Sequence, residues 1–192
     1  MPPKTAFRVE PLTPERWDDL VELFGTRGAC GGCWCMTPRL TRAEYEKHKG
    51  DGNKRKLRAL VARTVPGVLA YVGARPVGWC AIEPRTEFPA LSRSRILAPL
   101  DDQPVWSIVC LFVRKELRRQ GISSRLVEGA VAHAKRHGAR LIEAYPVEPK
   151  QDPMPDVFAY TGTAATFLRA GFREVLRRSP TRPIMRRAVR SR

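Results

Sequence analysis

The chain has 192 residues, of which 43% are hydrophobic, and its 35 lysines and arginines outnumber 19 acidic residues to give a net charge of +16. We expect one domain over residues 1–192, with a core at about 6–187 and a loose basic tail at 188–192. The longest apolar run, residues 105–113, is far shorter than the ~18 residues that a membrane span needs, and the N-terminus lacks the apolar stretch of a signal peptide. These features predict a cytoplasmic protein without a membrane partner. The five cysteines, an odd number, are expected to be reduced thiols.

The positive charge predicts an attraction for anions, namely phosphorylated cofactors, acidic metabolites or nucleic acid. The alternative is that the excess arginine is only solvated surface. Basic residues are spread along the chain and are densest at its C-terminal end, residues 177–192.

In the first half of the chain, the sequence pattern predicts a strand, three helices and a hairpin. We expect a strand at residues 6–12, followed by a helix at 13–25 with Thr13 as the N-cap residue. After a glycine-rich irregular stretch, Thr41 and Glu44 have the spacing of a capping box, and "KGDGN" divides the helical pattern that follows into two helices. Two apolar runs around "GARP" predict a hairpin at 67–85.

The second half alternates strands and helices. The connection 86–104 is polar and contains prolines, and we expect it to be a surface loop that carries function or a partner contact. Residues 105–113 are apolar on both faces, which is typical of a strand in the middle of a sheet. The remaining expected elements are a helix to Gly138, a strand at 139–147, a short helix closed by Gly171, and final strands at 172–178 and 182–188. This order predicts an α/β (α+β) fold, in which helices face a mixed sheet.

The segment "RRQGIS", residues 118–123, lies where the central strand passes into the long helix. The first backbone N–H groups of a helix lack partners and carry partial positive charge, so such a junction can bind an anion if the turn admits it. Gly121 has no Cβ to hold a phosphate away, Ser123 is small, and Arg118 and Arg119 add positive charge. The plain alternative is an ordinary glycine at a helix entry.

The stretch "LFVRKELRRQGISSRLVEGAV" resembles the coenzyme A segment of the GNAT acetyltransferase superfamily, a strand followed by Gln/Arg-x-x-Gly-x-Gly/Ala and a helix. Arg118, Gly121 and Ser123 occupy the three motif positions, with serine in place of the usual Gly/Ala. The later "FLRAGF", residues 167–172, is similar to the superfamily's helix–turn–strand ending in Gly-Phe. The order of elements from Phe7 to Met185 also fits, so the resemblance covers nearly the whole chain and implies a centrally splayed sheet.

The resemblance implies acetyl-CoA as co-substrate, with no metal. The backbone of the central strand would pair with the pantetheine arm, and amides at the helix entry would hold the pyrophosphate. The strand residues are Leu111, Phe112 and Val113. The residues at the entry are Arg118, Arg119, Gln120, Gly121, Ile122, Ser123 and Ser124. The implied activity is transfer of the acetyl group to a primary amine of a small molecule or peptide, and dimers are common in the superfamily.

Acetyl transfer to an amine needs a base for the ammonium proton and uses an acid for the leaving thiolate. Glu143 is expected within a strand among apolar neighbours, where desolvation raises proton affinity, and the family places a catalytic glutamate there in some members. A structural role for Glu143 is equally possible, Glu83 is the second candidate base, and either could act through water. Many relatives have a tyrosine as the acid where this chain has Phe167, so Tyr160 or Tyr145 could take its place.

Cysteines and histidines raise a second possibility, a metal site. Cys30, Cys33 and Cys35 form C-x-x-C-x-C but lack a second paired motif. We favour a flexible lip over the acceptor pocket, with Trp34 and Met36 as apolar contacts. Cys80 and Cys110 are expected to be small core residues. His133 and His137 are one turn apart, and we expect them on a solvated helix face.

Two other functions remain open from the sequence. A basic nucleic-acid-binding module is disfavoured because aromatic residues, 8% of the chain, mostly lie in apolar segments. A non-catalytic acyl-CoA sensor would keep the fold but lack a competent base. The acceptor is expected to be selected by the loops at 25–39 and 85–104.

Overall fold

Seven strands of the computed structural model form one sheet in the order β1-β2-β3-β4-β5-β7-β6. The structure describes residues 6–148 and 160–189. The strands are β1 (Phe7–Pro11), β2 (Gly67–Val72), β3 (Arg75–Pro84), β4 (Trp106–Val113), β5 (Leu141–Ala144), β6 (Arg173–Arg177) and β7 (Pro183–Ala188). Only the β4–β5 pair is parallel among these strands, so the expected mixed sheet is confirmed.

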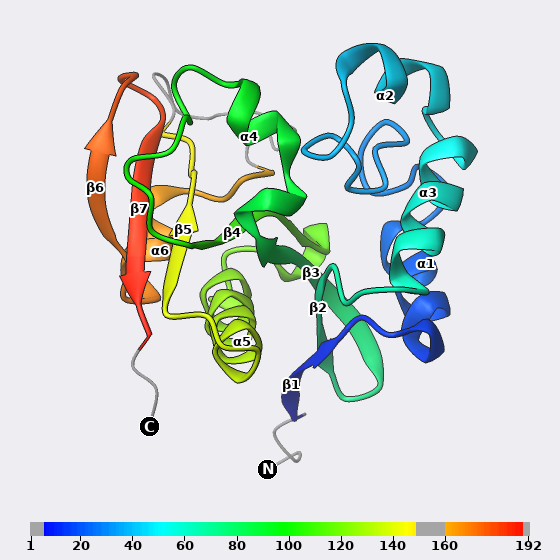
Figure 1. Cartoon of the computed structure of the whole chain (residues 1–192). Helices are drawn as coiled ribbons and strands as arrows, with labels where there is room; N and C mark the ends of the chain where they lie inside the picture. Colours follow the sequence, from blue (N-terminus) through cyan, green and yellow to red (C-terminus); the bar gives the residue numbers. More distant parts are fainter. Residues whose placement is uncertain (1–5, 149–159, 190–192) are drawn as a thin grey trace.

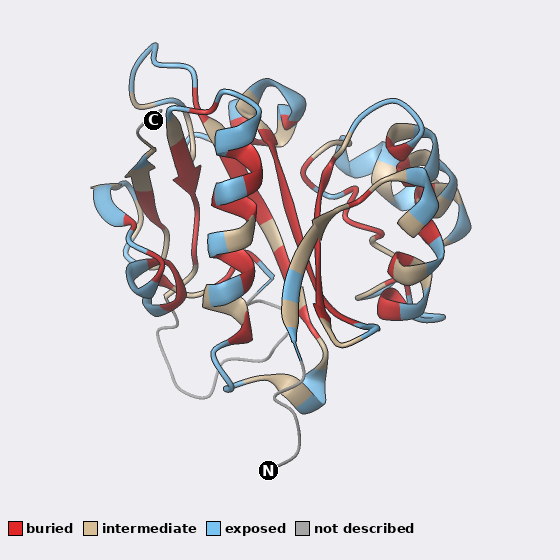
Figure 2. Ribbon diagram, turned by 90° about the horizontal axis from the view of Figure 1, so that it is seen from below, coloured by how far each residue is buried: buried red, intermediate tan, exposed pale blue. Residues whose placement is uncertain are grey.

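Helices cover both faces of this sheet (Figure 1). The α-helices are α1 (Trp17–Phe24), α2 (Arg42–His48), α3 (Asp51–Val61), α4 (Pro89–Arg93), α5 (Ile122–Arg136) and α6 (Ala164–Arg169). Short 3₁₀ turns are η1 (Pro14–Arg16), η2 (Arg85–Glu87) and η3 (Lys115–Leu117). Figure 2, seen from below, shows the buried side of α5 against one face of the sheet and α1 to α3 beyond the other face.

Two apolar clusters hold the layers together. One lies between the sheet and helices α5 and α6 and includes Ile108, Leu126 and Phe167. The other packs α1, α3 and the segment before α2 on the opposite face and includes Trp79, Trp34 and Leu20. Burial of this apolar surface is the main favourable contribution to folding.

Several sequence expectations about the elements are confirmed and others need correction. Thr41 and Glu44 form the expected capping box, and two helices follow as predicted. Thr13 is the N-cap residue of the turn η1 that leads into α1, but its side chain makes no cap hydrogen bond. The connection 86–104 is not only loop, since it contains α4.

Residues 188 and 189 are not part of a loose tail. Ala188 pairs with Leu141 at the end of β7, and the Val189 N–H donates to the Arg140 carbonyl at 2.8 Å. Residues 190–192 of the expected tail lie outside the described residues. Within 6–148 and 160–189, none of the helices combines the length and apolar character that crossing a membrane requires.

Candidate functional site

Strands β4 and β5 separate after a short contact, and this opens an edge of β4. They pair only from Trp106, opposite Ile142, to Ile108, opposite Ala144. On its other side β4 stays paired with β3 as far as Val113. The sheet therefore splays at its centre, as the fold expectation required.

Residues 109–113 present alternate backbone groups to the open edge. The Arg114 N–H donates to the Val77 carbonyl, so in this antiparallel pair Phe112 also faces β3 while Leu111 and Val113 face the opening. The two outward positions are not equivalent. The Leu111 N–H donates to the Tyr160 carbonyl at 2.6 Å, and the Val113 carbonyl accepts from Nε of Arg118 at 3.1 Å.

This use of Leu111 differs from the expectation that the backbone of residues 111–113 would be open to a ligand. The chain returns beside β4 at Tyr160, where β5 no longer covers the edge. The sequence carries no sign of this pairing, because the two residues are far apart along the chain.

An open groove of about 690 Å³ runs along this edge, and we call it the donor groove. It is lined by Arg27, Ala29, Cys30, Leu111, Phe112, Val113, Lys115, Arg118, Arg119, Ser123, Tyr160, Gly162, Thr163 and Thr166. Four of these side chains are basic and none is a carboxylate, counting the residues that the structure describes. The groove therefore favours an anionic ligand.

The entry to α5 has the backbone geometry that the sequence predicts. Gly121 is the N-cap residue at φ +74° and has no side chain to cap the helix, and no described side chain is bonded to the first N–H groups. A Cβ added at Gly121 would meet nothing within 4 Å, so space is open above it. Arg119, although not glycine, also has a positive φ of +62°. Left-handed residues at a helix entry turn neighbouring N–H groups toward one concave surface, which suits an anion.

Not every residue expected at this entry faces the groove. Arg118, Arg119 and Ser123 line it. The Gln120 side chain donates to the Glu116 carbonyl, Ile122 is buried in the core, and the Ser124 hydroxyl donates to the Thr166 carbonyl. The side chains of Gln120, Ile122 and Ser124 therefore have structural contacts and do not line the groove.

Sequence reasoning missed a second wall of the groove. Thr163 and Thr166 at the start of α6, together with Gly162, face α5 across the opening. Lys115 and Arg27 add positive charge from other segments. The "TGT" run before a helical stretch is a helix-start signal that could have pointed to the threonines, whereas nothing local indicates Arg27.

A smaller hollow of about 100 Å³ lies on the other side of Tyr160, and we call it the inner hollow. It is lined by Thr37, Pro38, Ala90, Leu91, Leu97, Val109, Tyr145, Tyr160, Thr161 and Arg182. Tyr160 lines both spaces and is 43% exposed. Partial burial raises the pKa of the Tyr160 phenol above its ordinary value, so the phenol keeps its proton at neutral pH.

Glu143 is buried but does not have the apolar surroundings that the sequence predicts. Its two carboxylate oxygens accept from Arg85 at 2.9 Å and from Arg186 at 2.7 Å. The Tyr145 hydroxyl also donates to Glu143 at 2.6 Å and is itself bonded to Arg85 and Ser107. These groups join β5, β7 and the start of the 85–104 connection, and Glu143 lines neither the donor groove nor the inner hollow.

Glu83, at the end of β3, is 5% exposed and has a simpler environment. It forms one ion pair, with Arg39, from the segment that also supplies Thr37 and Pro38 to the inner hollow. Burial raises the pKa of Glu83, and Arg39 only partly opposes the effect. Glu83 therefore has the raised pKa that was expected of Glu143, although an arginine pairs with it.

The centre of the cysteine-rich segment packs in the core, so Trp34 and Met36 are not the exposed pocket contacts that the sequence predicts. Trp34 and Met36 are buried in the second cluster, and Trp34 stacks on Trp17. Cys30 is exposed, Cys33 half-buried and Cys35 buried, so the three thiols do not share one environment. Among the described residues no group of three or more His, Cys, Asp or Glu side chains is arranged to hold a metal ion.

One histidine expectation is wrong. His133 is 2% exposed and packs against Trp106, while His137 is exposed. The helix turns His133 toward the sheet and leaves only His137 on the solvated face. Burial, with smaller contributions from His137 and Arg136, lowers the pKa of His133 to about 4.

Comparison with known proteins assigns the chain to a family. The sequence matches the model of the acetyltransferase (GNAT) family over residues 34–159, which is more than half of the chain. A comparison with curated proteins finds no match.

Solved structures support the same fold. The PaiA N-acetyltransferase from Thermoplasma acidophilum, in complex with coenzyme A, is 14% identical, and the match covers 96% of this chain and 99% of that one with a TM-score of 0.55. A GNAT-family acetyltransferase from Listeria monocytogenes is 12% identical over 95% of both chains with a TM-score of 0.57. An acetyltransferase from Thermus thermophilus is 18% identical over 97% of this chain and 99% of that one, with a TM-score of 0.52. The fold and the family match lead to one conclusion, that this chain belongs to the GNAT family of acetyltransferases.

Proposed function

We propose that the protein transfers the acetyl group of acetyl-CoA to a primary amine by direct attack of the amine on the thioester. The observation that supports this most directly is the donor groove, a basic groove that joins the open edge of β4 to the uncapped start of α5. A solved relative with the same fold is a complex with coenzyme A. The phosphates of that ligand match the charge of the groove.

The proposed pose uses backbone more than side chains. The pyrophosphate would accept hydrogen bonds from N–H groups of residues 119–124, with Arg118 and Arg119 nearby. The pantetheine arm would lie along β4 and pair with Val113. Pairing at Leu111 as well would require its N–H to exchange the Tyr160 carbonyl for the ligand. The acetyl group would then lie near Tyr160, between the donor groove and the inner hollow.

In the reaction the amine nitrogen forms a bond to the thioester carbonyl carbon, and the tetrahedral intermediate then breaks its carbon–sulfur bond. We propose Glu83, through water, as acceptor of the ammonium proton, since burial raises its pKa toward the useful range. Tyr160 would donate a proton to the leaving thiolate and be reprotonated by the second proton that the nitrogen of the intermediate loses. Glu143, paired with two arginines, is assigned to holding the structure together.

A non-catalytic acyl-CoA sensor is the second candidate. It is favoured by the position of the two glutamates, since neither lines the donor groove or the inner hollow. Thiol release on addition of an amine would exclude it. We also propose a cytoplasmic location, because an odd number of cysteines favours reduced thiols over a disulfide framework.

The decisive experiment compares alanine at the two ends of α5. Gly121 and Gly138 have φ values of +74° and +85°, and a Cβ would meet nothing at either position. Each alanine therefore costs a similar ~1–2 kcal/mol of backbone strain. We expect Gly121→Ala alone to weaken acetyl-CoA binding, by about 10-fold or more in calorimetric Kd, because only that residue forms the proposed anion site. Equal Kd values in the two variants, or no binding by the wild type, would refute the proposal.

A further inference from the structure

Arg182 is the one ionisable side chain in the inner hollow that is charged at neutral pH, among the described residues that line it. The other side chains there are aliphatic, or carry the neutral hydroxyls of threonine and tyrosine. No carboxylate lines this space within the described part of the chain. A ligand entering the inner hollow therefore meets a single positive charge in a mainly apolar wall.

This guanidinium is partly buried and has no counter-ion among the described residues. Its Nη1 donates to the Thr161 hydroxyl at 3.2 Å, and no described residue forms an ion pair with it. Burial lowers the pKa of Arg182, which is the direction expected when a cation loses water without gaining an anion. Moving a charged group out of water is costly unless it is paired.

Other partly buried arginines of this protein form ion pairs with its own carboxylates, which offsets the loss of hydration. Arg85 and Arg186 both reach Glu143, and Arg39 reaches Glu83. Arg182 differs because its guanidinium faces a cavity. An anion of matching size would complete the site from outside.

Resting on the proposed function, we infer that the acceptor is a small amino acid-like molecule whose carboxylate binds Arg182 beside its amine. A guanidinium binds a carboxylate in a bidentate manner, and the Thr161 hydroxyl lies next to it. Tyr160 borders both the inner hollow and the donor groove, so an amine attached close to that carboxylate would face the thioester.

Size and shape limit the rest of the acceptor. A space of about 100 Å³ corresponds to roughly three water molecules, enough for an amino and a carboxylate group but not for a whole large side chain. Thr37 and Ala90 also line a second, outer hollow of about 420 Å³, which is bordered by Tyr45, Arg93 and Glu46. The acceptor's side chain would extend into that outer hollow.

The test uses matched acceptors with the full-length protein and acetyl-CoA. For phenylalanine, methionine and alanine, kcat/KM is measured for the free acid, its carboxamide and the amine that lacks the carboxyl group. We expect each acid to exceed its amide by about 10–100-fold, the range for a hydrogen bond to a charged group. Equal rates for acid and amide would overturn the inference while leaving the proposed function intact.

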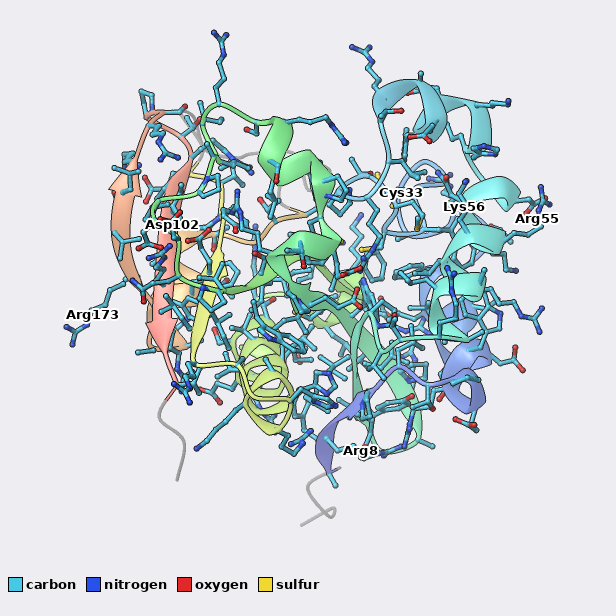
Figure 3. All side chains as sticks on the ribbon, in the orientation of Figure 1. Arg8, Cys33, Arg55, Lys56, Asp102 and Arg173 are labelled. Atoms are coloured by element: carbon cyan, nitrogen blue, oxygen red, sulfur yellow. The ribbon has the colours of Figure 1, made fainter. Side chains whose placement is uncertain are left out.

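Arg182→Met removes the charge and keeps much of the side-chain volume. We expect it to lower kcat/KM for the acids by about 10–100-fold, to leave the amides unchanged, and to leave the Kd for acetyl-CoA unchanged. Arg182→Lys should recover only part of the activity, because an ammonium group cannot bind the carboxylate in a bidentate manner. Arg173→Met is the control for charge, since this β6 side chain points away from the protein (Figure 3).

Two further outcomes are distinguishable. If Arg182→Met raises the Kd for acetyl-CoA and does not change the acid preference, the guanidinium serves the donor and the inference is wrong. If no amine is acetylated, the proposed function fails. Calorimetric titration of the same acids and amides into the CoA-saturated protein then tests the carboxylate site by itself, with acid-selective binding supporting it and unselective or absent binding refuting it.

Discussion

At the scale of single residues, position in the folded chain decides what a titratable group can do. Glu83 on β3 and Glu143 on β5 are both buried, on the two strands that flank β4, yet Glu83 has a single arginine partner and Glu143 has two. Arg182 has none among the described residues. A residue's chemistry in this protein therefore depends on how many opposite charges the fold brings to it.

His133 allows a pH test at the same scale. Its pKa falls from 6.5 unfolded to about 4 folded, so the unfolded chain binds more protons between these values and stability is lost as the pH falls through that window. We expect a loss of up to about 3 kcal/mol in the free energy of unfolding, measured by urea denaturation between pH 7 and 4.

The comparison variant for this measurement is His133→Leu. The Nδ1 atom of His133 has no hydrogen-bond partner, so an apolar side chain of similar size should cost little stability at pH 7. The variant should lose part of its acid sensitivity. Identical pH profiles for the variant and the wild type would contradict the buried, uncharged state of His133.

At the scale of elements, the Glu143 cluster ties three parts of the chain together. Arg85 at the start of η2 and Arg186 on β7 meet at Glu143 on β5, and Arg186 also binds Asp101 in the connection after α4. Arg85 further donates to the Leu97 carbonyl. This cluster fixes the connection that supplies Ala90, Leu91 and Leu97 to the inner hollow.

Replacing Glu143 or Glu83 by glutamine distinguishes a structural role of each carboxylate from a catalytic one. Glu143→Gln removes the charge that two arginines share, and we expect the free energy of unfolding to fall by about 3–5 kcal/mol. Glu83→Gln should cost less stability, because the raised pKa shows that burial already disfavours its charge. In that variant we expect kcat to fall by about 10²-fold or more, measured by thiol release at saturating acetyl-CoA.

Glu174→Gln is the matched control, because the same change breaks an exposed pair with Arg177 on β6. Exposed ion pairs contribute little to stability, so the free energy of unfolding and the kcat of this variant should stay close to the wild-type values. A larger fall in kcat for Glu143→Gln than for Glu83→Gln, with the protein still folded, would reverse the assignment of the base.

At the scale of the whole molecule, we expect the net charge of +16 to affect the association of acetyl-CoA more than it affects the fold. Four basic side chains border the donor groove, so the general excess of arginine and lysine is reinforced where acetyl-CoA is proposed to bind. The field of such a surface attracts a phosphorylated ligand before contact. Salt screens that field.

We therefore expect kcat/KM for acetyl-CoA to fall about 10-fold as NaCl rises from 0.1 to 1 M, over which the screening length shrinks from about 10 to about 3 Å. S-acetyl-N-acetylcysteamine, an uncharged thioester, is the control donor. Its kcat/KM should change little over the same range. An equal decline for both donors would show that the charge does not steer acetyl-CoA.

The sequence by itself determined the features that depend on local physics. Helix starts, the Thr41–Glu44 capping box, the break after β3 and the left-handed Gly121 at the entry to α5 follow from residues a few positions apart. The mixed sheet follows from the order of strands and helices, because a parallel β4–β5 pair needs a helix to cross between them. The backbone geometry at the start of α5 was therefore predictable.

Only the tertiary structure decided which side chains share a cavity or a charge. Glu143 meets arginines 58 and 43 residues away, and the Leu111 N–H bonds to Tyr160 across the splayed edge. The inner hollow combines Thr37, Ala90 and Arg182 from three separate segments. Such contacts cannot be read from local sequence, because burial and charge pairing depend on packing between elements. The proposals for the base and for the acceptor site therefore rest on the fold.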